Sequence, residues 1–295
     1  MRLGRYSTVG SSDIWPGVEI DGEVVNLHNV TNETKGSAIT SIRSLLQDED
    51  WESTVTEAID IAQQSSTGLY PIESVERQAP IAEPQKIIAV GLNYADHAEE
   101  SGNTPPEEPL IFAKFPQAIT GPDTPIRWDP SYTTAVDYEA ELVAVIGSEA
   151  RSVGPDEAQE YIAGYTIGND ISGRDLQGKD EQWVRAKSLD TFAPLGPTIV
   201  TDDEISDVTD LDIWAEVNGN RVQDSSTSEM FFDVEDLVSF CSDAFTLKPG
   251  DLIFTGTPAG VGYFRDPQIL LDNGDTVTVG IEELGTLRNH CQYES

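Results

Sequence analysis

The sequence is poor in basic residues, in histidine and in cysteine. Its 295 residues include 17 lysines and arginines against 53 aspartates and glutamates, which gives a formal net charge of -36 at pH 7. Such a charge repels phosphate backbones and anionic lipids, so it argues against binding to nucleic acid or to a membrane. Because the acids are spread along the whole chain, and because molar salt shortens the Debye length to about 3 Å, we interpret the charge as adaptation to molar salt. A specific cationic partner is the alternative.

Long apolar runs are also missing. No segment approaches the roughly 20 apolar residues that a membrane-spanning helix needs, and the start, MRLGRYSTVG, lacks the apolar stretch of a secretory signal. We therefore expect a soluble cytoplasmic protein. The two cysteines, Cys241 and Cys291, form no CxxC pair and are too few for a disulfide framework. Cys241 follows an apolar helical pattern, which predicts an inert buried thiol, with a disulfide to Cys291 as the alternative.

Short β-prone segments dominate the chain from residue 85 onwards, and helical patterns are few. Strands are expected at 86–92, 109–115, 141–147, 163–170, 196–201, 211–222, 251–257 and 275–281. Helices are expected at 94–102, 155–161, 180–186 and 233–244, the last with Asp233 as N-cap. The pattern predicts a β-dominated α+β fold, because the regular strand–helix alternation of a doubly wound fold is missing.

The first 80 residues differ from the rest. The alternating segment 17–27 predicts a β-hairpin, and apolar spacing predicts helices near 38–47 and 54–64. A loop with prolines then leads into the β-rich part. We therefore predict a small N-terminal accessory α+β domain over 1–82 and a catalytic domain over 83–295.

Three acids form a candidate metal site. Glu139 and Glu141 flank the start of the expected strand in DYEAELVAVIG, and residues two apart on a strand point to one face. Asp170 ends another expected strand, in YTIGND. Three carboxylates at converging strand ends would suit Mg²⁺, Mn²⁺ or Ca²⁺. The alternative is that they are ordinary acids of an acid-rich chain.

His97 is the histidine with a useful neighbour. It lies at the start of an expected helix in GLNYADHAEESG, and Glu100 follows three residues later on the same helical face. A carboxylate beside an imidazole fixes its tautomer and raises its basicity, which favours acid–base catalysis. The alternative is a surface His–Glu pair. His28 and His290 have no acid partner at useful spacing, so we expect them to be structural.

Two of the scarce lysines lie between apolar residues. Lys114 lies in LIFAKF and Lys187 in RAKSLDTF, where a lysine could bind a substrate carboxylate or could extend to solvent along an apolar surface. The glycine-rich segments 168–173 and 256–262 match neither nucleotide-binding pattern, so they predict tight turns that bring backbone amides close to a ligand. GxSxG and HExxH motifs are absent from the sequence.

Eight segments, taken together and in this order, resemble the fumarylacetoacetate hydrolase family. They are VGLNYADHAEE (90–100), EPLIFAKFPQAITGP (108–122), DYEAELVAVIG (137–147), AGYTIGNDISGRDLQ (163–177), AKSLDTFAPLGPTIV (186–200), VNGNRVQDSST (217–227), LKPGDLIFTGTPAGVG (247–262) and LDNGDTVTVGIEELGTL (271–287). The resemblance implies the family's mixed β-sandwich roll, a variable N-terminal domain and a homodimer. It also implies a lid over the ligand at 99–110.

The resemblance assigns roles residue by residue. It implies Glu139, Glu141 and Asp170 as ligands of Mg²⁺ (or Mn²⁺, with Ca²⁺ possible). It implies His97, Glu100 and Lys187 as catalytic residues, and Arg174, Gln177, Thr257 and Lys114 as substrate-binding residues. The substrate class is a small 2-oxo carboxylate, whose carboxylate and keto oxygens chelate one cation.

The motif supports several reactions. The His97–Glu100 pair favours a hydrolase of acylpyruvates or a decarboxylase of the oxaloacetate type, either of which cleaves a C–C bond. A 2-hydroxyhepta-2,4-diene-1,7-dioate isomerase, a ureidoglycolate lyase and a dehydratase of 2-keto-3-deoxy sugar acids are alternatives on the same site. A non-catalytic binding protein is the alternative of another class.

Overall fold

One large sheet runs through the whole molecule. The computed structural model describes residues 1–36 and 38–294. The sheet has the strand order β4-β3-β2-β1-β14-β12-β11-β17-β6-β7, with β5 paired to β1 and β8 paired to β14. Its strands are β1 (Arg2–Thr8), β2 (Trp15–Ile20), β3 (Glu23–Asn26), β4 (Leu69–Pro71), β5 (Val75–Gln78), β6 (Ile87–Gly91), β7 (Leu110–Lys114), β8 (Ile119–Thr120), β11 (Ala140–Ile146), β12 (Ile162–Asn169), β14 (Ala193–Val200) and β17 (Leu252–Phe254).

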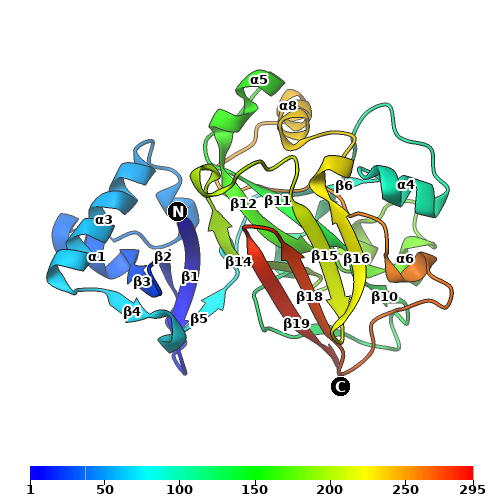
Figure 1. The fold of residues 1–295 in the computed structure, drawn as a ribbon, viewed down its shortest axis with the longest axis horizontal. Helices are drawn as coiled ribbons and strands as arrows, with labels where there is room; N and C mark the ends of the chain where they lie inside the picture. The colour runs from blue at the N-terminus through cyan, green and yellow to red at the C-terminus, as the bar shows by residue number, and fades with distance from the viewer. Residues whose placement is uncertain (37, 295) are drawn as a thin grey trace.

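A second sheet covers the central strands of the first. Its order is β16-β15-β18-β19-β9, and Figure 1 shows it in front of β11, β12 and β14. Its strands are β9 (Ile126–Trp128), β15 (Asp212–Val217), β16 (Asn220–Ser226), β18 (Thr276–Ile281) and β19 (Gly285–Tyr293). A short ladder joins β10 (Val136–Asp137) to β13 (Ser172–Gly173).

The burial of β11 explains how the layers are held together. Every residue of this strand is buried. Leu142 and Ala144 belong to the core shared with the second sheet, whereas Val143 and Val145 belong to the core shared with the N-terminal segment. Since successive side chains of a strand point to opposite faces, β11 separates two apolar layers.

Helices lie at the edges of the sheets. The N-terminal helices are at the left of Figure 1 beside β1–β4, and α5 and α8 lie together at the top. The α-helices are α1 (Leu27–Lys35), α2 (Ile42–Leu45), α3 (Trp51–Ser65), α4 (Ala95–Ser101), α5 (Pro155–Ala158), α6 (Arg174–Gln177), α7 (Val184–Lys187) and α8 (Val234–Ala244). The 3₁₀-helices are η1 (Ile72–Ser74), η2 (Pro116–Ala118), η3 (Gln159–Tyr161), η4 (Asp202–Glu204), η5 (Thr227–Glu229) and η6 (Gly262–Phe264).

The predicted strand-rich α+β class is confirmed. The 17–27 hairpin is present as β2 and β3, and Asp233 caps α8 by accepting a hydrogen bond from the Asp236 amide. Three α-helices are shorter than predicted: α2 occupies part of 38–47, α5 ends at Ala158 and gives way to η3 within 155–161, and α7 covers 184–187 where 180–186 was expected. The first begins late because Ser41 and Ser44 form a capping box. Residues 181–183 form bends and a turn before α7 begins.

The large sheet crosses the predicted domain boundary. β1 pairs with β14, so the N-terminal strands continue the same sheet as the strands of the site. The division into 1–82 and 83–295 stays a prediction. Within the described part of the chain, no helix combines the length and apolarity needed to cross a bilayer.

Candidate active site and metal centre

The three predicted metal ligands lie together at adjacent strand ends. β11 and β12 pair antiparallel, with Glu141 opposite Gly168, and the Asp170 amide donates a hydrogen bond of 2.9 Å to the carbonyl of Glu139. One carboxylate oxygen from each of the three acids lies within 4.8 Å of those of the other two. All three side chains are buried. The register of the two strands therefore builds the acid cluster.

Three cationic side chains face the acid cluster. The Lys187 Nζ lies 2.6 Å from Glu139 Oε2 and 2.8 Å from Asp170 Oδ2. The Arg174 Nη2 lies 2.7 Å from Glu139 Oε1. Lys114 forms an ion pair with Asp170 and also donates a hydrogen bond to the backbone carbonyl of Lys187. The cations thus contact Glu139 and Asp170, while Glu141 Oε2 accepts a hydrogen bond from the Gly256 amide at 2.9 Å.

The acids respond differently to this environment. Burial would raise the pKa of Glu139, but Lys187 and Arg174 outweigh it and lower the pKa to about 2. Burial, with the nearby charges of Asp170 and Glu139, raises the pKa of Glu141 well above its usual range. Burial lowers the pKa of Lys114, against the opposing effect of Asp170. The cluster therefore holds Glu139 ionised and disfavours the charge on Glu141.

The residues fit a divalent cation. A buried carboxylate that repels its neighbours is stabilised when a cation binds between them, and Glu141 is such a group. Three carboxylate oxygens make a hard, oxygen-rich ligand set, which suits Mg²⁺, Mn²⁺ or Ca²⁺. The structure therefore supports the interpretation of a metal site over that of ordinary acids of an acid-rich chain.

A cavity of about 330 Å³ opens beside the acid cluster. Its polar wall comes from Glu139, Arg174, Gln177, Lys187, His97 and Thr257, which are six of the ten predicted site residues. Its apolar wall comes from Val90, Leu110, Phe112, Trp183, Tyr263 and Phe264. A small ligand in this cavity would meet charged groups on one side and aromatic rings on the other.

Four predicted site residues do not line the cavity. Glu141 and Asp170 lie next to Glu139 in the acid cluster, and Glu100 contacts the His97 ring. Lys114 is fully buried and faces Asp170, so its side chain is directed to the cluster rather than to a ligand in the cavity. Neither Lys114 nor Lys187 extends to solvent, since their side chains are 0% and 3% exposed.

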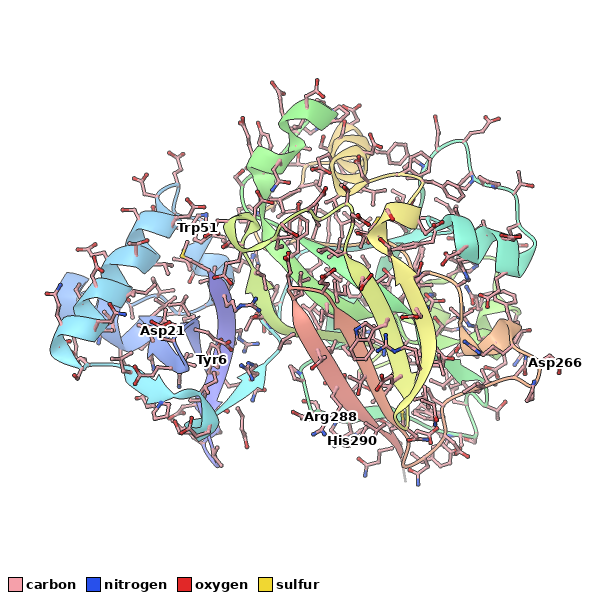
Figure 2. All side chains as sticks on the ribbon, in the orientation of Figure 1. Tyr6, Asp21, Trp51, Asp266, Arg288 and His290 are labelled. Atoms are coloured by element: carbon pink, nitrogen blue, oxygen red, sulfur yellow. The ribbon has the colours of Figure 1, made fainter. Side chains whose placement is uncertain are left out.

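His97 lies at one wall of the cavity. It is 8% exposed, and its Nδ1 lies 3.4 Å from Oε2 of Glu100, an exposed residue, so the imidazole is buried while its acid partner reaches the surface. Its ring packs against that of Phe264, with centroids 5.9 Å apart. By contrast, His28 contacts the carbonyl of Ile39. His290 lies on β19, near the C-terminus of the chain (Figure 2).

The glycine-rich loop 256–262 presents its amides to acids of the site. The Gly256 amide donates to Glu141, the Gly260 amide to both carboxylate oxygens of Glu100 at 3.0 and 3.1 Å, and the Gly262 amide to Asp137. Gly256 has a φ of +102°, and a Cβ there would lie 2.9 Å from the Cβ of Asn93. The loop therefore needs glycine at this position to approach the site closely.

Sequence reasoning missed several residues of the site. The Gln223 side chain is buried and donates to Thr257 Oγ1 at 2.9 Å, so it orients that hydroxyl. Trp183 and Phe112 form an edge-on pair, with centroids 5.3 Å apart, at the cavity wall. The Nε and Nη2 atoms of Arg174 both contact the Asp137 carboxylate. The acid before the ExE pair, in DYEAE, was the available signal for Asp137.

Comparison with known proteins identifies the family. The sequence pattern described as fumarylacetoacetate (FAA) hydrolase C-terminal matches residues 86–292, which is more than half of the chain. The chain belongs to the fumarylacetoacetate hydrolase family. It is therefore an enzyme, and its strand-rich fold is that of the family.

Three relatives illustrate the family's chemistry. A mitochondrial oxaloacetate tautomerase of Xenopus laevis is 40% identical over 294 residues, which cover 98% of this chain and 89% of the relative. The structure of 2-hydroxyhepta-2,4-diene-1,7-dioate isomerase from Mycobacterium marinum is 35% identical, with a TM-score of 0.77 over 100% of this chain and 99% of that one. Maleylpyruvate hydrolase from Sphingobium sp. SYK-6, in complex with manganese(II) and pyruvate, is 28% identical, with a TM-score of 0.79 over 100% of both chains.

Proposed function

We propose that the protein is a divalent-metal-dependent enzyme that interconverts the keto and enol forms of an oxaloacetate-type 2-oxo dicarboxylate. The observation that carries the proposal is that one cavity is lined both by Glu139 of the acid cluster and by His97 of the His97–Glu100 pair. The oxaloacetate tautomerase of Xenopus laevis, which matches along nearly the whole chain, supports this choice of reaction.

Each residue of the site has a separate role in such a proton transfer. A divalent cation at the acid cluster would act as a Lewis acid toward the substrate's carboxylate and keto oxygens. His97, oriented by Glu100, takes the proton from carbon 3; the electrons of that C–H bond form the double bond between carbons 2 and 3, and the π electrons of the keto group move to the oxygen on carbon 2. A proton is then returned to the oxygen on carbon 2, which completes the enol. Lys187, Arg174 and Thr257 hold the ligand's oxygens from the polar wall.

Cleavage of a C–C bond is the second candidate. His97 with Glu100 could activate a water for hydrolysis of an acylpyruvate, and the hydrolase of Sphingobium with its bound pyruvate favours this chemistry. Decarboxylation of oxaloacetate would use the same cavity without a water. Tautomerisation conserves every carbon of the substrate, whereas both cleavage reactions release pyruvate from suitable substrates.

The two candidates separate in one assay. Purified protein in molar KCl with Mg²⁺ receives the enol of oxaloacetate, and the decay of enol absorbance is followed beside a lactate dehydrogenase assay for pyruvate. We expect fast loss of enol without matching pyruvate. Pyruvate formed at the rate of enol loss, or from acetylpyruvate, would instead establish cleavage. Enol decay at the rate of a protein-free solution containing the same Mg²⁺ would refute tautomerisation.

Four further properties belong to this proposal. We infer Mg²⁺ or Mn²⁺ as the working cation, a homodimer as the assembly, and a salt-rich cytoplasm as the setting. The charge of -36 supports the last, because unscreened repulsion would destabilise the compact chain. Thermal unfolding in low and molar KCl tests the adaptation to salt, and light scattering in molar KCl tests the dimer.

The fourth property is the division of the chain into domains at 82/83, which limited proteolysis between β5 and β6 would test.

A further inference from the structure

Asp137 is a fully buried acid that belongs neither to the acid cluster of Glu139, Glu141 and Asp170 nor to the lining of the cavity. It lies on β10, where it pairs with Ser172 of β13, and Arg174 begins the helix that directly follows β13. Its side chain is 0% exposed. A buried carboxylate is retained only with strong partners, so its contacts indicate its role.

One set of contacts fixes Arg174. Asp137 Oδ2 accepts from Arg174 Nε at 2.9 Å and lies 2.8 Å from Nη2. The remaining Nη1 of Arg174 donates to Gln177 Oε1 at 3.0 Å. Nε and Nη2 of the guanidinium both face the one oxygen Oδ2, so Asp137 restricts the orientation of an arginine that lines the cavity.

The other set of contacts fixes the loop that carries two aromatic wall residues. Asp137 Oδ1 accepts from the Gly262 amide at 2.8 Å, and Oδ2 accepts from the Tyr263 amide at 3.0 Å. A Cβ on Gly262 would lie 1.8 Å from the carbonyl oxygen of Ile269 and 2.7 Å from Asp137 Oδ1. Glycine at this position therefore permits the close approach that brings both amides to the carboxylate.

The surroundings of Asp137 require both of its carboxylate oxygens to accept hydrogen bonds. Besides the contacts above, its Oδ1 accepts from the Tyr138 amide at 3.0 Å, so four N–H groups donate to one carboxylate that also forms an ion pair with Arg174 Nη2. An ionised carboxylate offers only acceptors, whereas an amide side chain would direct its NH₂ group at these donors. The donor set thus selects aspartate over asparagine at nearly the same size.

We propose that Asp137 is a positioning residue that couples the orientation of Arg174 to the seating of the Tyr263–Phe264 wall. Because one carboxylate holds both, the arginine and the aromatic wall reach their places in the cavity together. The inference rests on the proposed function, since a 2-oxo carboxylate in the cavity is what Arg174 is held to meet. Asp137 acts on that ligand through Arg174 and the loop, without touching it.

The first test is Asp137→Asn, measured against the wild type in molar KCl with saturating Mg²⁺. We expect the KM for the 2-oxo acid to rise about tenfold or more while kcat changes less than about threefold. A loss of properly folded enzyme would lower kcat and leave KM in place. An unchanged KM in a folded variant would overturn the proposal.

A matched pair at position 263 isolates the loop contact. Tyr263→Ala removes the ring and keeps the amide that donates to Asp137, whereas Tyr263→Pro removes both. The second position of a short 3₁₀-helix tolerates the φ of proline, and the preceding glycine tolerates the neighbouring ring. We expect a KM for the proline variant at least about threefold above that of the alanine variant. Equal values would contradict the coupling, and this pair decides the matter if Asp137→Asn does not fold.

Two readouts do not depend on turnover. In metal-free protein, hydrogen exchange of segment 260–266 should accelerate in Asp137→Asn relative to the wild type, because asparagine keeps only one of the two oxygens that accept from the Gly262 and Tyr263 amides. With Mg²⁺ present, the affinity for pyruvate should fall about tenfold, as measured by calorimetry.

These readouts separate the two proposals. A wild type that binds pyruvate but does not tautomerise oxaloacetate would refute the proposed reaction and leave Asp137 testable. A variant with wild-type pyruvate affinity and unchanged exchange would refute the role of Asp137.

Discussion

Replacing Glu141 by glutamine should make the metal-free protein more stable and the metal-loaded protein less so. Glu141 is buried, and Asp170 and Glu139 act with burial to raise its pKa well above the usual range. Each unit by which a folded-state pKa is raised costs about 1.4 kcal/mol of stability at a pH above it. Glutamine removes that cost and keeps an oxygen for the Gly256 amide.

The sign of the pH dependence follows from the same shift. A carboxyl group with a raised folded-state pKa binds its proton more tightly in the folded chain than in the unfolded one. Metal-free wild-type protein should therefore lose stability as the pH rises from the unfolded-state pKa, about 4.3, toward the raised folded-state value. The Glu141→Gln variant should lack this part of the pH dependence.

The metal response gives the magnitude. A cation present at 100 times its Kd stabilises the folded state by about 2.7 kcal/mol, which raises the Tm of a 295-residue chain by roughly 4 °C. Loss of an outer-shell partner weakens metal binding by about 10–100-fold, so loss of a ligand should cost at least about 100-fold. At the same cation concentration, binding would then stabilise the folded variant by only about 0.4 kcal/mol and raise its Tm by roughly 1 °C.

Differential scanning fluorimetry with EDTA and with Mg²⁺, both in molar KCl, measures these shifts. A variant with the wild-type increase in Tm would refute the role of Glu141 as a ligand. Glu149→Gln is a matched control, because that acid is exposed and pairs with Lys248 on the surface. It should keep the full response to Mg²⁺.

Three other substitutions test the remaining parts of the site. His97→Gln should lower kcat by about 100-fold or more without changing the Mg²⁺ affinity, and near-normal turnover would remove His97 from the proton transfer. Lys114→Met should lower the stability of metal-free protein by about 3–5 kcal/mol, because it leaves Asp170 buried without this partner; an unchanged Tm in EDTA would contradict that. Gln223→Leu should raise KM and lower stability by about 1–3 kcal/mol, because it removes the donor to Thr257 Oγ1 and leaves the Ala140 amide without its acceptor. Full activity in that variant would show that the hydroxyl of Thr257 needs no orientation.

Strong local patterns made much of the fold predictable. β11 and β12 read as apolar β-prone runs, and α8 has an aspartate cap and an apolar face, so each was found near its true bounds. Helix α1 was missed because its sequence, LHNVTNETK, is rich in asparagine and threonine, which have low helix propensity. Its side-chain cap from Asn26 and its packing against α3 and β2 supply what propensity does not.

The site was predictable where residues share an element and less so where the topology brings them together. Glu139 directly precedes β11 and Glu141 lies on it two residues later, and His97 and Glu100 lie on one helix three residues apart, so spacing alone proposed both pairs. Gln223 reaches Thr257 from a strand of the other sheet, and such a contact has no local signal.

For Lys114, the sequence predicted burial of the side chain but not the group that it contacts. Its apolar flanks correctly indicated burial, but whether it faces a ligand or Asp170 depends on β7 packing beside the turn that follows β12.

A crystal of the protein soaked with Mn²⁺ tests the central claim most directly. The account predicts one anomalous peak per chain, about 2.2 Å from a carboxylate oxygen of each of Glu139, Glu141 and Asp170. A fully soaked crystal with no peak between these three side chains, and with the Lys187 ammonium still bridging Glu139 and Asp170, would contradict it.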